Sequence, residues 1–255
     1  MSDARMRGRF VWYDLMTTDP KKAEPFYTRV LGWGTQPFEG MPYTMWTANG
    51  TPIGGVGEVQ PPGTPPHWIA YIAVEDVDAA VKQIESLGGK THVPGTDIPS
   101  VGRFAVVADP QGAVFSVFTP TDGGSGPGGD AEPNIGEFSW HELMTTDYAR
   151  GFAFYQQMFG WEKTAEHDMG PLGIYLIFGR NGRELGGMFT MTPDMRMPPN
   201  WMQYVRVDSA DAAAERVKAN GGQVIHGPMD VPGGDRIAQC LDPQGAAFAV
   251  HAKPA

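Results

Sequence analysis

The segment FVWYDLMTTD at residues 10–19 recurs as FSWHELMTTD at residues 138–147. The two copies agree at 7 of 10 positions. Each copy starts with an apolar run rich in aromatic residues, which is typical of a β-strand. Each ends at an Asp of the kind that begins a helix. One strand-to-helix unit therefore occurs twice, about 128 residues apart.

Further motifs repeat in the same order. FYTRVLGW at 26–33 matches FYQQMFGW at 154–161, and DPQGA occurs at both 109–113 and 242–246. Because the order is collinear, the chain is a duplication of a whole domain. We predict domains at residues 8–120 and 136–253, joined by a Gly- and Pro-rich linker at 121–135.

Each half contains two similar patterns of elements. In the first half, Asp19 and Pro20 predict a helix start and Gly32 its end, although Pro25 interrupts this helix. Asp76 predicts the start of a second helix. Strands are predicted at residues 10–16, around 43–47 and 53–59, and at 67–74, 103–108 and 113–118. We therefore predict an α+β fold with two βαβββ units in each half.

Composition limits the possible partners and the compartment. The net charge of −10, without a basic run, argues against a nucleic-acid partner. Cys240 is the single cysteine, so an intrachain disulfide is impossible. No apolar run approaches the length of a membrane span, and the first ten residues do not resemble a secretory signal. We expect a cytoplasmic protein without a membrane or nucleic-acid partner.

The two strand–Asp–helix units, the FYTRVLGW and FYQQMFGW helix ends and the DPQG hairpins together resemble the vicinal oxygen chelate superfamily. That superfamily includes glyoxalases, bleomycin-resistance proteins and extradiol dioxygenases. The resemblance implies four βαβββ units paired into two cupped-sheet domains. It also implies that enzymes of the family bind a divalent metal in the cup.

The resemblance also assigns positions to the three usual metal ligands. In this chain those positions hold Trp12, Ile69 and Ser116 in the first half, and Trp140, Met202 and Ala249 in the second. None supplies an imidazole or a carboxylate, the groups that such a cation needs. We therefore predict no cofactor. A divalent metal at a displaced site, held by Glu142, His251 and either His226 or His167, is the alternative.

The adjacent residues His141 and Glu142 point to opposite faces of their strand, because side chains alternate. The resemblance directs Trp140 into the cup, so Glu142 shares that direction, as does Asp14 in the first half. His141 is then directed toward the helices, where its counterpart is Tyr13. We expect a structural histidine, with a ligand role only if the register shifts by one residue.

Glu142 is the candidate catalytic residue, because an acid on a pocket wall must be solvated, paired or functional. It could form an ion pair with Arg206, anchor a ligand, or act as a general base. The candidate ligand-binding residues are Trp12, Asp14, Tyr71, Trp140, Glu142, Tyr204 and Arg206. Their large aromatic rings suit a flat, apolar ligand.

Three other residues have two interpretations each. Arg103 and Arg236 recur before the DPQG hairpins and could form salt bridges or contact an anionic ligand. Cys240 has Val107 as its counterpart, which favours a buried apolar role over a nucleophile.

The sequence supports three functions. The first is a protein that binds a small apolar or aromatic molecule without a metal, as bleomycin-resistance members do. The second is a metal-dependent glyoxalase-like lyase or dioxygenase with the displaced site, so enzymatic activity stays an open question. The third is an interaction scaffold. Because fused domains mimic a dimer, the sequence is compatible with a monomeric pseudo-dimer or with a homodimer.

Overall fold

The computed structural model describes residues 6–121 and 131–254. The greater part of the predicted linker, residues 122–130, therefore lies outside the described residues. The strands form two eight-stranded sheets, with the orders β2-β3-β4-β1-β5-β8-β7-β6 and β10-β11-β12-β9-β13-β16-β15-β14. The second order repeats the first with each strand number raised by eight. The α+β fold and its four βαβββ units are thus confirmed.

The first half contains eight strands and two helices. They are β1 (Phe10–Thr17), α1 (Pro20–Leu31), β2 (Gly34–Pro37), β3 (Thr44–Ala48), β4 (Thr51–Glu58), β5 (His67–Ala73), α2 (Val77–Ser86), β6 (Lys90–Ile98), β7 (Gly102–Ala108) and β8 (Val114–Pro120).

The second half repeats this order, with one added 3₁₀ turn, η1. Its elements are β9 (Phe138–Thr145), α3 (Tyr148–Phe159), β10 (Glu162–Asp168), η1 (Gly170–Leu172), β11 (Ile174–Arg180), β12 (Arg183–Thr190), β13 (Asn200–Arg206), α4 (Ala210–Ala219), β14 (Gln223–Asp230), β15 (Arg236–Leu241) and β16 (Ala247–Ala252).

The helix boundaries follow from the residues that cap them. The Asp19 side chain accepts a hydrogen bond from the Lys22 amide at 3.2 Å and begins α1. Gly32 ends α1 in the left-handed conformation, with φ of 73°. The helix continues through Pro25, as predicted. Within the described part of the chain, no helix is long and apolar enough to cross a membrane.

The DPQG motif forms the turn of a hairpin in each half. Asp109 Oδ1 accepts hydrogen bonds from the amides of Gln111 and Ala113, at 2.8 and 3.0 Å. Asp242 caps the second turn in the same way. The motif therefore connects β7 to β8 and β15 to β16, which confirms both predicted hairpins.

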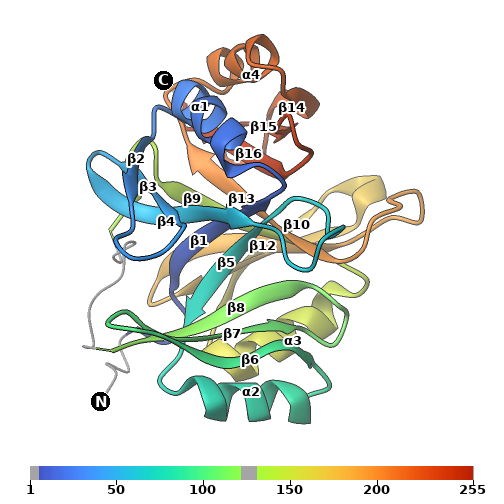
Figure 1. Cartoon of the computed structure of the whole chain (residues 1–255). Helices are drawn as coiled ribbons and strands as arrows, with labels where there is room; N and C mark the ends of the chain where they lie inside the picture. Colours follow the sequence, from blue (N-terminus) through green and yellow to red (C-terminus); the bar gives the residue numbers. More distant parts are fainter. Residues whose placement is uncertain (1–5, 122–130, 255) are drawn as a thin grey trace. The chain divides into compact units, whose positions relative to one another are not determined.

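The chain packs into two compact units, and each unit takes segments from both halves. Unit 1 comprises Met1–Val11, Ala70–Asp130 and His141–Trp201, and unit 2 comprises Trp12–Ile69, Ala131–Trp140 and Met202–Ala255. In unit 1, α2 lies beside α3 (Figure 1). In unit 2, α1 lies beside α4, where Arg216 Nε donates to the Val30 carbonyl at 2.9 Å (Figure 1).

Each unit has an aromatic core built from equivalent residues of the duplication. The core of unit 1 includes Phe10, Phe115, Tyr155, Phe159, Trp161, Phe178 and Trp201. The core of unit 2 includes Tyr27, Trp33, Trp46, Trp68, Phe138 and Phe248. Most of the tryptophans therefore stabilise the fold by burial, as large aromatic residues usually do.

Candidate functional site

A buried carboxylate on β1 is hydrogen-bonded to a tyrosine in unit 2. Asp14 is only 7% exposed. The Tyr43 hydroxyl donates to Asp14 Oδ1. Trp12 Nε1 donates to the same carboxylate oxygen at 3.0 Å and to the Tyr43 hydroxyl at 2.8 Å. Two of the predicted ligand-binding residues, Trp12 and Asp14, thus form one network with Tyr43.

Unit 1 contains the equivalent pair. Glu142 on β9 is also 7% exposed, and the Tyr175 hydroxyl donates to its Oε2 atom at 2.9 Å. Tyr175 follows Tyr43 at the same separation that relates the motif LGGM to IGGV. We call Asp14–Tyr43 and Glu142–Tyr175 the acid–tyrosine pairs. Each of these carboxylates needs a hydrogen-bond donor, because burying an isolated carboxylate is strongly unfavourable.

A glycine on the neighbouring strand makes room for each tyrosine. Asp14 is in register with Gly55, and Glu142 is in register with Gly187. A Cβ atom on Gly55 would lie 2.0 Å from the Tyr43 hydroxyl oxygen, and one on Gly187 would lie 2.1 Å from the Tyr175 ring. The second glycine of IGGV and LGGM therefore allows the phenol to cross the strand and reach the acid.

His141 is a structural histidine in unit 1. It is 4% exposed and stacks on Phe10, with ring centroids 3.6 Å apart. Its Nδ1 atom lies 2.7 Å from the Leu185 carbonyl oxygen. Burial lowers the pKa of His141 to about 3, so the ring stays neutral. In unit 2 its counterpart Tyr13 stacks on Phe138 in the same way, also at 3.6 Å.

Tyr71 and Tyr204, two further predicted ligand-binding residues, belong to different units. In unit 1, Tyr71 contacts the rings of Phe104 and Phe118, with centroids 6.0 and 6.5 Å away. In unit 2, the Tyr204 hydroxyl accepts a hydrogen bond from Gln239 at 2.8 Å.

Arg206 and Trp140 also lie in unit 2. Arg206 Nη1 donates to Glu132 at 3.1 Å and to the Pro133 carbonyl at 2.6 Å. The ion pair that the structure shows for Arg206 is therefore with Glu132. Trp140 is half-buried.

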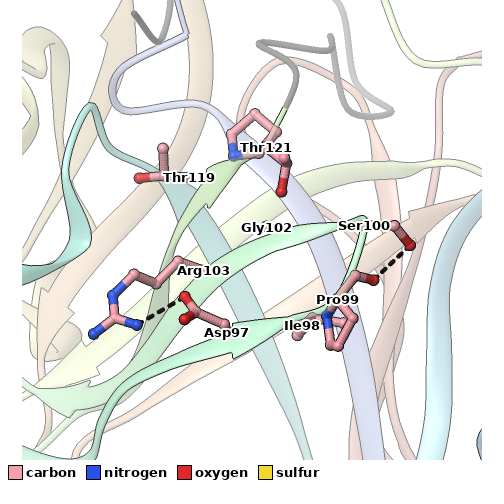
Figure 2. Close-up of a pocket in the computed structure, with 9 residues that line it drawn as sticks. Asp97, Ile98, Pro99, Ser100, Gly102, Arg103, Thr119 and Thr121 are labelled. Carbon is pink, nitrogen blue, oxygen red and sulfur yellow. Dashed lines mark hydrogen bonds and ion pairs between the residues drawn. The ribbon is translucent and has the colours of Figure 1, made fainter.

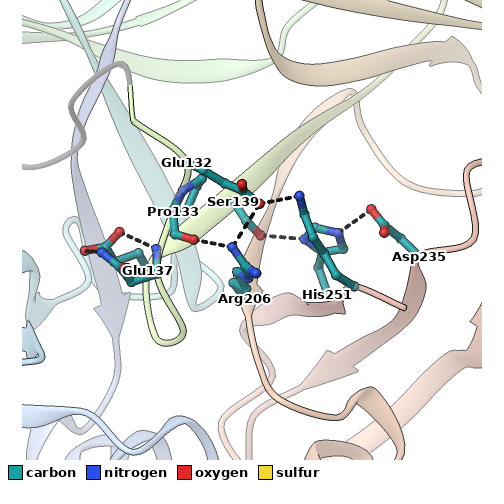
Figure 3. Close-up of polar contacts among 9 residues, drawn as sticks. Glu132, Pro133, Glu137, Ser139, Arg206, Asp235 and His251 are labelled. Carbon is teal, nitrogen blue, oxygen red and sulfur yellow. Dashed lines mark hydrogen bonds and ion pairs between the residues drawn. The ribbon is translucent and has the colours of Figure 1, made fainter. Parts of the chain in front are cut away.

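The surroundings of His251 bear on the alternative of a displaced metal. Its Nδ1 atom lies 2.9 Å from Ser139 Oγ and its Nε2 atom 2.7 Å from Asp235 Oδ2 (Figure 3). Protein groups therefore occupy both ring nitrogens. His226 is exposed on β14, and His167 is half-exposed on β10.

The residues at the positions of the usual ligands do not fit a divalent metal. Trp, Ile, Ser, Met and Ala side chains supply neither imidazole nor carboxylate. In residues 6–121 and 131–254, no group of three or more His, Cys, Asp or Glu side chains could hold a metal ion.

Arg103 and Arg236 form equivalent salt bridges. Arg103 binds Asp78 at 2.9 Å and Asp97 at 2.8 Å. Arg236 binds Asp211 and Asp230, which occupy the equivalent positions. Arg103 borders a surface hollow of about 340 Å³, where Figure 2 shows its bond to Asp97. Two carboxylates already neutralise each guanidinium, which supports the salt-bridge interpretation over an anion site.

Cys240 is fully buried in β15. Burial raises the pKa of its thiol to about 12. Because the thiolate is the nucleophilic form, this cysteine is inert, as its apolar counterpart Val107 suggested.

Tyr43 and Tyr175 are the site residues that the sequence patterns missed. A usable signal existed, because both tyrosines recur at one separation together with the Gly-Gly motifs. Pairing each tyrosine with an acid on another strand required the strand register, which the sequence does not provide.

Comparison with known proteins agrees with this fold. The model of the Glyoxalase/Bleomycin resistance protein/Dioxygenase superfamily matches residues 9–117 and 137–250. The chain belongs to this superfamily. The match covers nearly the whole of both halves, so membership rests on the duplicated fold and not on a single motif.

Two relatives align over almost their full length. "Putative glyoxylase CFP32" of Mycobacterium bovis is 37% identical over 252 residues, which cover 96% of this chain and 94% of that protein. "Anthracycline biosynthesis protein DauV" of Streptomyces sp. (strain C5) is 30% identical, with coverage of 95% and 92%.

Solved structures of the superfamily share the fold. A Mn(II)-bound glyoxalase from Novosphingobium aromaticivorans has a TM-score of 0.66 at 16% identity and covers 97% of this chain and 82% of its own. The 2,3-dioxygenase LapB from Pseudomonas sp. KL28 has a TM-score of 0.69 at 13% identity, with coverage of 98% and 94%. At these identities the likeness concerns the fold alone.

Proposed function

We propose that this protein binds a small apolar or aromatic molecule and does so without the metal triad usual in its superfamily. The repeated acid–tyrosine pair is the observation that carries the proposal. The duplication keeps a buried carboxylate, a phenol donor and a space-making glycine in both halves. A polar anchor in largely apolar surroundings is the usual design of a small-molecule site.

The chemistry of the pair suits a ligand with one or more oxygen atoms. The carboxylate accepts hydrogen bonds, whereas the phenol can donate one or accept one. The pair could therefore bind a ketone or a hydroxyl group. Tyr71 and the half-buried rings of Phe104 and Phe118, which belong to the same unit as Glu142 and Tyr175, form a separate aromatic cluster on which a flat ligand can stack.

The name of the relative DauV guides the choice of probe. It is called an anthracycline biosynthesis protein. We would titrate the protein by calorimetry with anthracyclines, simpler hydroxyquinones and aromatic antibiotics. We expect at least one of these classes of compound to bind saturably, with a measurable heat of binding. Its absence across all of them would count against the proposal.

Substitutions within the pairs locate the site. Tyr175→Phe and Tyr43→Phe each remove one hydroxyl, and we expect the variant at the occupied pair to bind about 10-fold more weakly. Tyr148→Phe on α3 is the matched control, because that tyrosine contacts neither acid. Unchanged affinity in both pair variants would remove the pairs from the binding site.

The alternative of a metal-dependent lyase rests on the name of the relative "Putative glyoxylase CFP32", since the described residues offer no group of three or more metal ligands. It predicts stoichiometric Mn, Fe, Ni or Zn in protein purified without chelators, measured by elemental analysis. The proposed binding function predicts unchanged ligand affinity after exhaustive dialysis against EDTA.

Glu142→Gln would abolish activity if Glu142 served as a general base on the bound ligand.

A further inference from the structure

Ser139, His251 and Asp235 form a hydrogen-bonded chain in unit 2 (Figure 3). Ser139 lies at the start of β9, His251 near the end of β16, and Asp235 just before β15. The Ser139 Oγ to His251 Nδ1 distance is 2.9 Å, and the His251 Nε2 to Asp235 Oδ2 distance is 2.7 Å. Both distances lie within hydrogen-bonding range.

The fold does not need these three residues. The equivalent positions of the first half hold Val11, Phe118 and Gly102, yet that half forms the same strands in the same order. The duplication therefore separates residues that specify the fold from residues that do not. A serine, a histidine and an aspartate that meet only in the second half call for a chemical explanation.

The hydrogen bonds fix the state of the imidazole. A carboxylate only accepts hydrogen bonds, so the proton of the neutral ring lies on Nε2, facing Asp235. The Nδ1 atom, 2.9 Å away, is then the nearer acceptor for the Ser139 hydroxyl, since the Tyr204 carbonyl oxygen lies 3.4 Å away. A hydroxyl, a base and a carboxylate that orients the base are the parts of an activated nucleophile. The two ring nitrogens exchange the roles that they have in the serine-protease triad.

The cationic side chain of Arg206 lies next to the hydrogen-bonded residues Ser139, His251 and Asp235. Arg206 is in register with His251 on the neighbouring strand, and its Nη1 atom is held by Glu132 and the Pro133 carbonyl. Figure 3 shows the guanidinium between these groups and the histidine. Arg206 also lines a surface hollow of about 620 Å³, and Ser139 is half-buried rather than sealed. A fixed cation can stabilise negative charge that develops on a reacting oxygen.

We propose that Ser139 is a nucleophile, with His251 as its base and Asp235 as a positioning residue, and that it takes an acyl group from small esters. The Ser139 oxygen forms a bond to the ester carbonyl carbon while its proton passes to His251 Nδ1. The bond to the leaving alcohol then breaks, and that proton passes to the alcohol. Water attacks the acyl-serine by the reverse proton path and releases the acid. None of these residues belongs to the acid–tyrosine pairs, so neither proposal depends on the other.

A fluorophosphonate probe tests the nucleophile in the full-length protein. The serine oxygen forms a bond to phosphorus, fluoride leaves, and the proton passes to the base. We expect mass spectrometry to place the adduct on Ser139 and p-nitrophenyl acetate to be hydrolysed by the same protein. Absence of an adduct at Ser139 in folded protein, or equal modification after denaturation, would overturn the proposal.

The first half supplies matched substitutions. Ser139→Val copies Val11 and should abolish the adduct, whereas His251→Phe copies Phe118 and should slow its formation at least about 100-fold. Ser86→Ala, on the exposed face of α2, is the control and should react like the unmodified protein. Thermal melting monitors folding, and Ser139→Ala replaces the valine variant if that one unfolds. An unchanged rate in folded His251→Phe would contradict the proposal.

Asp235→Asn tests the positioning role, with Asp235→Glu as the conservative variant. An amide at this position can donate a hydrogen bond to His251 Nε2, which would place the ring proton on Nδ1 and leave the Ser139 hydroxyl without its acceptor. The labelling rate of folded Asp235→Asn should therefore fall by about 10-fold or more, whereas Asp235→Glu should keep most of the rate. If both variants lost the rate equally, in proportion to the folded protein lost in thermal melting, Asp235 would be rejected as a positioning residue.

Discussion

His141 and Glu142 are adjacent but have opposite environments. His141 is stacked on Phe10, and its Nδ1 atom lies 2.7 Å from the Leu185 carbonyl oxygen. Glu142 is equally buried but receives the hydroxyl of Tyr175. Alternation along the strand separates a residue of the core from a residue of the candidate site. The duplication supports this separation. Tyr13, the counterpart of His141, also stacks on a phenylalanine, and Asp14, the counterpart of Glu142, also accepts a tyrosine hydroxyl.

The buried histidine predicts a loss of stability in acid. Its pKa is lowered by burial from 6.5 to about 3, so its contribution is present above pH 6.5 and is lost as the pH falls from 6.5 toward 3. That loss is about 1.4 kcal/mol for each pH unit. His141→Tyr, which copies Tyr13, should remove this part of the pH dependence. Urea unfolding at pH 7.5, 6, 5 and 4 measures it.

The exposed residue His92 provides the control. His92→Gln should keep the pH dependence of the unmodified protein. If His141→Tyr and the unmodified protein lost stability in parallel between pH 6.5 and 4, the buried neutral state of His141 would be wrong.

At the scale of elements, the glycines of β4 and β12 decide where a tyrosine can lie. Gly55→Ala would place a Cβ atom 2.0 Å from the Tyr43 hydroxyl oxygen. The ring must then move away from Asp14. We expect a loss of about 1–3 kcal/mol in the free energy of unfolding. Gly57→Ala, two residues along the same strand, meets its nearest side chain at 3.7 Å and should be close to neutral.

Thermal and urea unfolding of the two glycine variants provide the measurement. Equal stabilities would show that the space over Gly55 is not needed by the tyrosine. Ligand affinity, measured on the folded Gly55→Ala variant, should also fall if the Asp14–Tyr43 pair is the occupied one.

Sequence patterns predicted the elements that have capping residues or apolar runs. Asp19, Gly32 and the DPQG turns placed helices and hairpins because their hydrogen bonds are local. The sequence did not locate β2 and β6, because their exposed side chains lack an apolar alternation. The acid–tyrosine pairs and the serine–histidine–aspartate chain were also missed, since each joins residues from segments far apart in the sequence, which only the strand register brings together.

Tyrosines of one half of the duplication bind the DPQG turns of the other half. In unit 2, Tyr27 donates to Asp242 Oδ2 at 3.1 Å, and in unit 1 Tyr155 donates to Asp109 Oδ2 at 2.9 Å. Burial raises the pKa of the Asp109 and Asp242 carboxyls, because it disfavours their charged form. The hydrogen bonds that the tyrosine hydroxyls donate offset part of this cost. The tyrosines of the FYTRVLGW and FYQQMFGW motifs thus form hydrogen bonds to the aspartates of the DPQG motifs.

This arrangement predicts that the halves stay together when the chain is cut. A protease site introduced within residues 122–130 and cleaved should leave a complex with the mass of the intact chain, 27.6 kDa. Light scattering coupled to size-exclusion chromatography measures that mass. Two fragments that separate and unfold independently would contradict the account of the compact units.

Tyr155→Phe tests one of these contacts. It leaves Asp109 with one donor fewer and removes the acceptor of the Trp201 indole N–H. We expect a loss of about 1–3 kcal/mol in the free energy of unfolding, which a double-mutant cycle with Asp109→Asn should show to be coupled. Additive effects of the two substitutions would mean that the contact contributes nothing of its own.

We propose that the acid–tyrosine pairs bind the ligand. A crystal structure of the metal-free protein with the tightest-binding compound from the calorimetric titrations tests this proposal. We predict density for the compound with one of its oxygen atoms within hydrogen-bonding distance of Tyr43 and Asp14, or of Tyr175 and Glu142. A compound bound away from both pairs, or a metal ion held by either acid, would contradict the account.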